Sequence, residues 1–206
     1  YRMSFTPRTT APTDLSTWYG SYNDWNRFSS YSRGNCTWYA YGRTGEIAGR
    51  NIYEEFRITS GNGDAKYWIY NTWPDQTVTS GSIDLQPGDI LVYGSSSGAG
   101  HVEIVEEING SNILTSYSVY GDTYGAATYF NTRTIAYPTW SSTMGTVIDN
   151  DGGPHTYSNP LIGYIHNKYY DPTPTPVISK APLIASMRLA LKRRRHRSFI
   201  KRRWYL

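Results

Sequence analysis

Cysteine occurs once in the 206 residues, so the chain cannot form an intramolecular disulfide, and cysteine usage does not reveal its redox compartment. Long apolar runs are missing as well: none is long enough to cross a bilayer, and no signal-peptide pattern appears. Long helical patterns are few, whereas tyrosine, tryptophan, glycine, serine and threonine are plentiful. This composition predicts a sheet-rich domain with broad loops. The chain begins at Tyr1 rather than at methionine, as a processed or excised piece of a longer protein would.

Acidic residues are absent from one part of the chain. Residues 180–206 contain ten of the 20 lysines and arginines but no Asp or Glu. The rest of the chain therefore carries ten basic residues against all 16 acidic ones. The basic character of the whole sequence is a property of this tail, and it says little about the charge of any cleft in the body.

The single cysteine, Cys36, stands where a helix is expected to begin. Residues 40–48 place apolar side chains on one helical face, and Gly49 is a typical helix stop. Gly34 or Asn35 can serve as the N-cap, which puts Cys36 in the first turn. The unpaired N–H groups and the dipole at a helix N-terminus favour the nucleophilic thiolate. The alternative is a free cysteine that packs as a small hydrophobic residue.

A histidine about sixty-five residues downstream supplies a candidate base. Residues 90–93 are expected to form a strand, and a Gly/Ser loop at 94–100 returns the chain into a second strand that begins at His101. A thiolate–imidazole pair needs a cysteine at a helix start and a histidine on a facing strand. A single histidine is more often structural, but the two segments together predict a nucleophile and its base.

Three sequence motifs resemble one family. Gly-Asn-Cys-Thr-Trp-Tyr-Ala at 34–40, Pro-Gly-Asp-Ile-Leu-Val-Tyr at 87–93 and Gly-His-Val-Glu-Ile-Val-Glu-Glu-Ile at 100–108 are similar to the CHAP domain, the cysteine- and histidine-dependent amidohydrolase/peptidase. The resemblance covers roughly residues 20–170. It implies a papain-like, NlpC/P60-like α+β fold, in which the nucleophile helix packs on an antiparallel β-sheet. It also implies cleavage of an amide bond in bacterial peptidoglycan, without a metal or organic cofactor.

A third group that orients the histidine is harder to identify. If Asn109-Gly110 forms a two-residue turn and Ile108 pairs with Ser111, then His101 lies opposite Ser118. Relatives in the CHAP family generally place Glu, Asp or Asn on this strand, and aligning on the pair at 120–121 puts Tyr117 there instead. A backbone carbonyl or a water is a further alternative. Glu103 is on the same face as His101, but neighbours two apart on one strand are expected to diverge.

Aromatic side chains near the cysteine offer a candidate substrate surface. Trp38, Tyr67, Trp68 and Trp73 are predicted to form a wall for a glycan or a peptide stem, with plain core packing as the alternative, above all for Trp68. No metal site is predicted. Some CHAP relatives bind calcium just before the cysteine, but residues 23–26 here contain a single Asp, which favours a solvated turn.

The expected domain organisation has four parts. Residues 1–17 are an arm or linker, residues 18–170 the CHAP catalytic domain, residues 171–179 a stiff Pro/Thr linker, and residues 180–206 the basic tail. The tail is expected to bind anionic wall polymers or a membrane surface, with a disordered solvated tail as the alternative. No specific nucleic-acid partner is predicted.

The sequence therefore predicts a peptidoglycan hydrolase, an N-acetylmuramoyl-L-alanine amidase or an endopeptidase, that acts outside the cell on the bacterial wall. A catalytic domain followed by a Pro/Thr linker favours a phage lysin or a virion-associated lysin, released at host lysis or carried on the particle. The alternative is a non-catalytic CHAP-like module that binds or builds part of a phage particle or of a cell-wall assembly. The lack of an acid opposite His101 is the feature that favours this alternative.

Overall fold

A computed structural model describes residues 5–12, 17–19, 28, 34–56, 63–70, 73–120, 128–149 and 151–170. The predicted linker at 171–179, the basic tail at 180–206 and the candidate calcium segment at 23–26 lie outside the described residues.

The predicted helix is present and has the predicted ends. Helix α1 spans Cys36–Ala48, and Asn35 is its N-cap, with a side-chain oxygen that accepts a hydrogen bond from the backbone N–H of Trp38. Gly49 ends the helix in the left-handed conformation (φ 64°), which glycine adopts without a steric penalty. The residues that flank α1 in the sequence, Asn35 and Gly49, therefore determine where the helix begins and ends.

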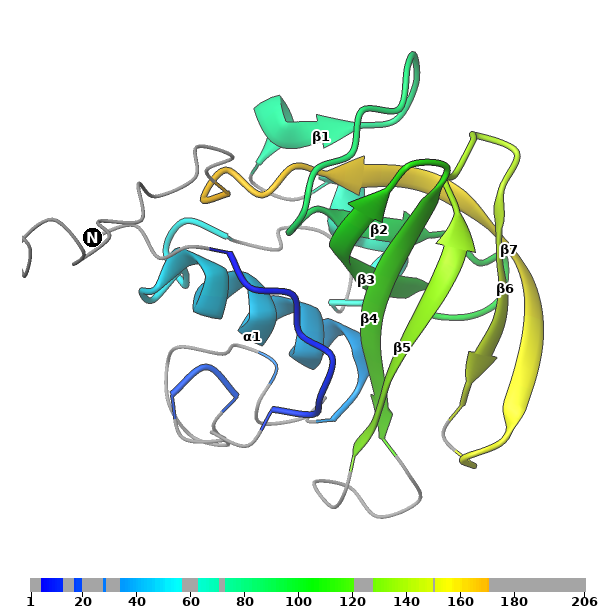
Figure 1. Cartoon of the computed structure of the whole chain (residues 1–206), viewed down its shortest axis with the longest axis horizontal. Coiled ribbons are helices and arrows are strands. Elements are labelled where there is room, and N and C mark those ends of the chain that lie inside the picture. The colour runs from blue at the N-terminus through cyan, green and yellow to red at the C-terminus, as the bar shows by residue number, and fades with distance from the viewer. Residues whose placement is uncertain are drawn as a thin grey trace, which may run out of the picture. The chain divides into compact units, whose positions relative to one another are not determined.

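The rest of the described chain is mainly an antiparallel sheet (Figure 1). Its main strands follow the order β1-β7-β2-β3-β4-β5, and β6 pairs with β7. The strands are β1 (Thr77–Val78), β2 (Ile90–Tyr93), β3 (His101–Asn109), β4 (Asn112–Tyr120), β5 (Thr128–Ala136), β6 (Thr143–Ile148) and β7 (Pro154–Ile165). Two short 3₁₀ helices, η1 (Ala65–Tyr70) and η2 (Pro74–Gln76), precede β1. The α+β fold with a helix on an antiparallel sheet is confirmed.

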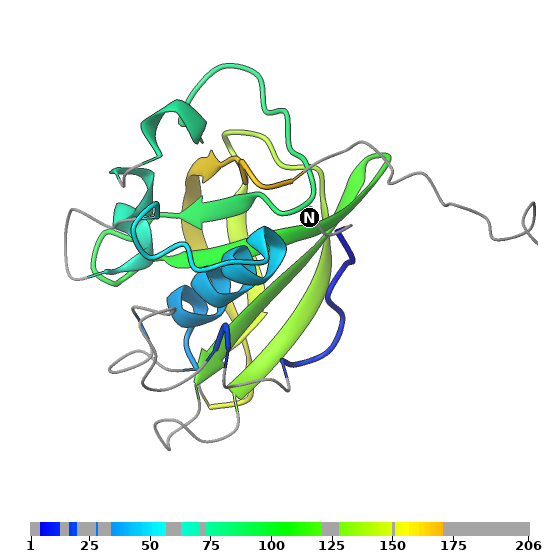
Figure 2. The same cartoon turned by 90° about the vertical axis from the view of Figure 1, so that its left-hand side faces the viewer.

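The central strands are buried on both faces. Figures 1 and 2 show α1 on one side of β2 to β5, and β6 with the paired part of β7 on the other. Ile90 and Val92 of β2 belong to the apolar cluster that includes α1, whereas Leu91 and Tyr93 pack in a second cluster with Met144 of β6. Because successive strand residues point to opposite faces, β2 is a continuous apolar run rather than an alternating one.

The pairing of β3 with β4 differs from the predicted register. Asn109 pairs with Asn112, so the turn residues are Gly110 and Ser111, and Gly110 has a φ of 61°. Glycine at the first central position suits this tight turn, because that position requires a positive φ. A bulge between Val105 and Glu107 shifts the pairing again. The predicted pairing of His101 with Ser118 is therefore wrong.

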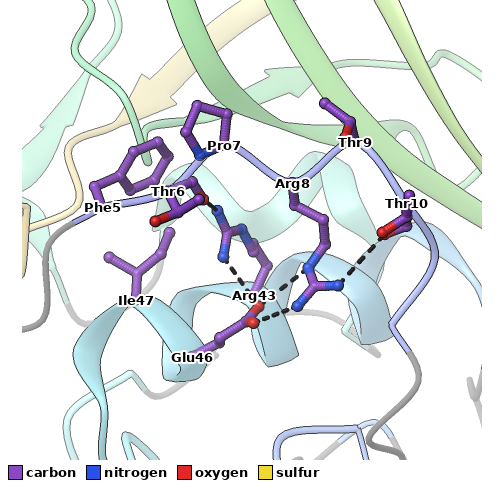
Figure 3. Close-up of a pocket in the computed structure, with 9 residues that line it drawn as sticks. All are labelled: Phe5, Thr6, Pro7, Arg8, Thr9, Thr10, Arg43, Glu46 and Ile47. Carbon is purple, nitrogen blue, oxygen red and sulfur yellow. Dashed lines mark hydrogen bonds and ion pairs between the residues drawn. The ribbon is translucent and has the colours of Figure 1, made fainter.

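Part of the predicted N-terminal arm is folded against the helix. Residues 5–10, here called the strap, lie beside α1 (Figure 3). Arg8 forms an ion pair with Glu46, and its backbone N–H donates to Glu106 Oε2 at 2.8 Å. The backbone carbonyl of Thr6 accepts a hydrogen bond of 2.6 Å from Arg43. These polar contacts attach the strap to both α1 and β3.

A buried charge network lies beneath the strap. Arg43 is 4% exposed and binds both carboxylate oxygens of Glu106, at 3.1 and 2.8 Å, while Glu106 itself is fully buried. Glu106 Oε1 also accepts a hydrogen bond from Ser116 Oγ at 2.6 Å, and Ser116 Oγ lies 2.8 Å from the hydroxyl of Tyr39. Buried ions are tolerated when their hydrogen-bonding groups are satisfied, as they are here.

Candidate active site

Cys36 is the first residue of α1 and is half-buried. Its neighbour Asn35 is held as an N-cap, since Asn35 Oδ1 accepts hydrogen bonds from Trp38 N at 3.0 Å and from Thr37 Oγ1 at 2.8 Å. This cap fixes the first turn, and the thiol therefore stands at the positive end of the helix dipole.

His101 is the first residue of β3, where it pairs with Tyr93 of β2. Gly100 precedes it with a φ of 77° and leaves no room for a side chain: a Cβ there would lie 2.4 Å from the carbonyl oxygen of Tyr93 and 2.9 Å from the backbone nitrogen of Lys66. The Gly/Ser loop thus packs closely against β2 and η1, and this packing fixes the position of His101 at the start of β3.

Replacing Gly100 with alanine is expected to lower the free energy of unfolding by about 3 kcal/mol, because the residue combines a positive φ with a steric clash. Gly110 provides a matched control: its φ is also positive, at 61°, but a Cβ added there would meet nothing within 4 Å. Gly110→Ala is expected to cost about 1 kcal/mol. Urea unfolding of both variants measures the difference, and equal losses would contradict a packing role for Gly100.

The structure brings Cys36 and His101 together. Burial alone would raise the pKa of the Cys36 thiol, but the charge and hydrogen bond of His101 and hydrogen bonds from the backbone of Val102 and Thr37 outweigh it and lower that pKa. Burial alone would lower the pKa of His101, but Cys36 and then Glu103 raise it to about 9. The two shifts favour a thiolate–imidazolium pair near neutral pH.

Glu103 takes the place beside His101 that was expected to hold a third group. Its Oε1 lies 3.4 Å from His101 Nε2, an ion-pair distance that is too long for a strong hydrogen bond. The expectation that these side chains diverge along β3 is wrong. Arg133 of β5 holds the carboxylate with two contacts, Nη2 to Oε1 at 2.6 Å and Nε to Oε2 at 3.2 Å.

Neither predicted third group makes a polar contact with the imidazole. Ser118 donates a hydrogen bond of 2.8 Å to the backbone carbonyl of Gly34, so it supports the loop before Cys36 instead. Tyr117 meets His101 edge to face, with ring centroids 5.3 Å apart, while its hydroxyl accepts a hydrogen bond from the backbone N–H of Ile148 at 2.8 Å. Tyr117 therefore packs against the ring without holding either ring nitrogen.

Cys36 and His101 open into a cleft of about 470 Å³. The Gly/Ser loop and the N-terminal end of α1 form one part of its wall, and residues from β4, β6 and β7 form the other. Its lining residues are Asn35, Cys36, Ser95, Ser97, Gly98, Ala99, Gly100, His101, Val119, Met144, Val147, Asp149, Tyr157 and Asn159. The cleft is therefore polar on the loop side and partly apolar on the β6 side.

The predicted aromatic wall does not line this cleft. Trp38, Trp68 and Trp73 are buried, and Trp68 stacks on Phe28 with ring centroids 5.6 Å apart. Tyr67 is half-buried and lies away from the cleft lining. The burial of the three tryptophans agrees with the alternative of core packing, and the cleft lining gives no support to a substrate-binding role for these four residues.

Within the described residues, no group of three or more His, Cys, Asp or Glu side chains is placed to hold a metal ion. In the same part of the chain, no helix has both the length and the apolar character needed to span a membrane.

Sequence reasoning missed the role of Arg133, which no short motif marks. The alternation of β3 did place Glu103 and His101 on one face. Alternation does not take into account that a glutamate side chain can reach the residue two positions away on the same strand when an arginine on β5 holds its carboxylate.

Comparisons with known proteins relate the region around the site to a known family. A family model described as the CHAP domain matches residues 25–119, which include Cys36 and His101. Two crystal structures of Ly7917 are similar: one with the hydrolyzing product of MDP (20% identity, TM-score 0.39, 65% of this chain and 53% of that chain) and one of Ly7917 alone (24%, 0.36, 51% and 48%). The matched region spans about half of the Ly7917 chain. No curated protein matches the chain. The region of the chain that holds Cys36 and His101 is therefore similar to the CHAP domain.

Proposed function

We propose that the protein is a peptidoglycan hydrolase that cleaves an amide bond by a Cys–His mechanism. The observation that carries this proposal is the contact of Cys36, at the N-terminus of α1, with a His101 whose pKa is raised to about 9; both residues line the same cleft. The match to the CHAP domain supports bacterial peptidoglycan as the substrate, because the resemblance to that family implies cleavage of the cell wall.

In the proposed reaction, the Cys36 thiolate attacks the carbonyl carbon of the scissile amide. The backbone N–H of Cys36, at the helix start, helps to stabilise the resulting oxyanion. Because Nε2 of His101 is turned toward Glu103, Nδ1 is the ring nitrogen that faces Cys36 and gives its proton to the leaving amine. A water then attacks the thioester and gives a proton to His101. The bond between the carbonyl carbon and the Cys36 sulfur breaks, the carboxylic acid product leaves, and the thiolate–imidazolium pair is restored.

The proposal extends to the organisation of the chain. Residues 18–170 form the catalytic domain, residues 171–179 are a linker and residues 180–206 are a tail that binds anionic wall polymers or a membrane surface. The protein acts on the wall from outside the cell, as a phage lysin or a virion-associated lysin. The non-catalytic alternative was motivated by a missing acid beside His101, and the position of Glu103 removes that reason.

Loss of turbidity of purified Gram-positive cell walls, with mass spectrometry of the released fragments, tests the function. An amidase frees the amino terminus of the stem peptide from the muramoyl group, whereas an endopeptidase creates a new amino terminus within the peptides. Walls from several species should be compared, since cross-bridges differ. Intact walls across the panel, from a folded protein whose Cys36 reacts with iodoacetamide, would contradict the proposed substrate.

The rate of hydrolysis is expected to fall by about tenfold per pH unit above the pKa of His101, which is about 9. The sign follows from the proton: the protonated imidazole serves as the acid for the leaving amine, and it loses that proton as the pH rises through its pKa. Initial rates on soluble wall fragments between about pH 5 and about pH 10 measure this limb. A rate that keeps rising above the pKa of His101, which is about 9, would contradict the role of His101 as the acid.

A further inference from the structure

Two glutamates of β3 are fully buried, and each is paired with an arginine from another element. Glu106 binds Arg43 of α1, and Glu103 binds Arg133 of β5. Buried ion pairs of this kind contribute little net stability compared with apolar residues of similar size. The two pairs differ in one respect: among the described residues, Glu103 is the carboxylate that also lies against His101.

Arg133 fixes Glu103 from the far side of the carboxylate. Besides its two contacts with Glu103, its Nη1 donates to the backbone carbonyls of Met144, at 2.5 Å, and Thr146, at 2.9 Å. These carbonyls belong to β6, whose Met144 and Val147 side chains line the cleft. The carboxylate is thus held between the sheet and the wall of the cleft, and its Oε1 lies 3.4 Å from His101 Nε2, a buried nitrogen that makes no hydrogen bond within the described residues.

We propose that Glu103, clamped by Arg133, is the positioning residue of this site: it orients the His101 ring and stabilises the protonated imidazole. A cysteine–histidine pair needs such a group to fix which ring nitrogen faces the thiol. Here the group comes from the same strand as the histidine, two residues on. The positioning role of Glu103 in catalysis rests on the proposed function, but the experiments that test its contact with His101 do not measure wall hydrolysis.

The surroundings of His101 leave Glu103 as its nearest negative side chain among the described residues, apart from Cys36. The tyrosine rings of Tyr93, on β2, and Tyr117, on β4, lie 6.4 and 5.3 Å away between centroids. Asp149, which follows β6, lines the same cleft, and the Arg133 guanidinium contacts Glu103. Cys36 first and then Glu103 raise the pKa of His101 to about 9, so the carboxylate is the second of the two groups that act on the ring.

The pH dependence of Cys36 alkylation tests the proposal directly. Cys36 is the single cysteine of the chain, so iodoacetamide reports on this thiol alone. Glu103→Gln keeps the shape and an acceptor oxygen but removes the charge. We expect the alkylation rate near neutral pH to fall by about threefold to tenfold, because a carboxylate within about 4 Å supports an imidazolium by about one pKa unit or more. At about pH 10, where the thiol ionises without help, the two rates should agree within about twofold.

Glu106→Gln is the matched control, since it neutralises a glutamate on the same strand that is equally buried and also paired with an arginine. Its alkylation profile should follow that of the wild type within about twofold at both pH values, even if its stability falls. An unchanged profile in Glu103→Gln would overturn the proposal. So would equal changes in both variants, because a general loosening of β3 would then explain them.

If Glu103→Gln does not fold, ¹⁵N NMR of the histidines in the wild-type protein decides. A His101 that keeps its Nε2 proton across the neutral range, and titrates well above the ordinary pKa of about 6.5, supports the carboxylate contact. A ring that, once neutral, carries its single proton on Nδ1, or a ring that titrates at an ordinary pKa, overturns it. None of these measurements uses cell walls, so a failure of wall hydrolysis would leave their outcome intact.

Discussion

Cys36→Ala is expected to reduce the hydrolysis of cell walls by at least about ten-thousandfold, because the proposed reaction passes through a covalent bond to this sulfur and no other residue can form it. The fold should persist, since the side chain is small, half-buried and packed at the edge of the core. Turbidity loss and fragment analysis, beside thermal unfolding, measure the two effects separately.

Cys36→Ser is the matched variant for this test. It keeps the volume and a polar atom at the helix start, but a serine hydroxyl does not ionise near neutral pH, so its activity should be almost as low as that of the alanine variant. Wild-type protein alkylated with iodoacetamide should lose activity to the same extent. Clearing of walls by Cys36→Ala at a rate within about tenfold of the wild type would assign the hydrolysis to other residues.

Arg43→Met is expected to lower the free energy of unfolding by about 3–5 kcal/mol, because it leaves the fully buried carboxylate of Glu106 without its cation. The melting temperature should fall by about 10 °C in a domain of this size. The substitution also removes the hydrogen bond to the carbonyl of Thr6, and with it one attachment of the strap. Denaturant unfolding at neutral pH measures the loss.

Arg50→Met is the control for this prediction. Arg50 pairs with Glu55 at 2.8 Å, but its side chain is 57% exposed, so removing it should cost at most about 1 kcal/mol. Adding Glu106→Gln to Arg43→Met should restore part of the lost stability, because the unpaired charge disappears. Equal losses in Arg43→Met and Arg50→Met would contradict the assignment of a buried, energetically costly charge to Glu106.

The sequence was sufficient to predict the parts of the site that depend on short stretches of chain. An N-cap, a helix start and a Gly stop lie within residues 35–49, and each is specified by residue types at fixed spacing. The strand at 90–93 and the start of β3 at His101 were likewise predicted by a turn and a Gly/Ser loop beside them. That Cys36 and His101 would meet rested on motif resemblance, since no local pattern fixes a contact over sixty-five residues.

The third group depends on features that a single strand does not encode. The turn lies at Gly110 and Ser111 rather than at Asn109 and Gly110, and the register changes again at the bulge after Val105, so counting back from the predicted turn gave the wrong partner for His101. The alternation rule did place Glu103 on the correct face, but the direction of its side chain depends on Arg133, which is thirty residues away on β5.

The burial of the aromatic residues could also not be predicted from composition. Tryptophans suit both a sugar-binding wall and a core, and only the packing of distant segments decides between them. Trp73 lies in the core because Phe56 meets its ring with centroids 4.6 Å apart. The residues that do line the cleft on the β6 side, such as Met144 and Tyr157, belong to β6 and β7, which none of the three sequence motifs covers.

The strap has a consequence for the order in which the domain forms. The hydrogen bond from the backbone of Arg8 to Glu106 joins residues 98 positions apart, so the first described residues of the chain are attached to a strand made much later. During synthesis the strap leaves the ribosome before either α1 or β3 exists to receive it, and closing so long a loop is costly until both are in place. The strap therefore belongs to the final stage of folding, and contacts formed last act mainly by slowing unfolding rather than by speeding folding.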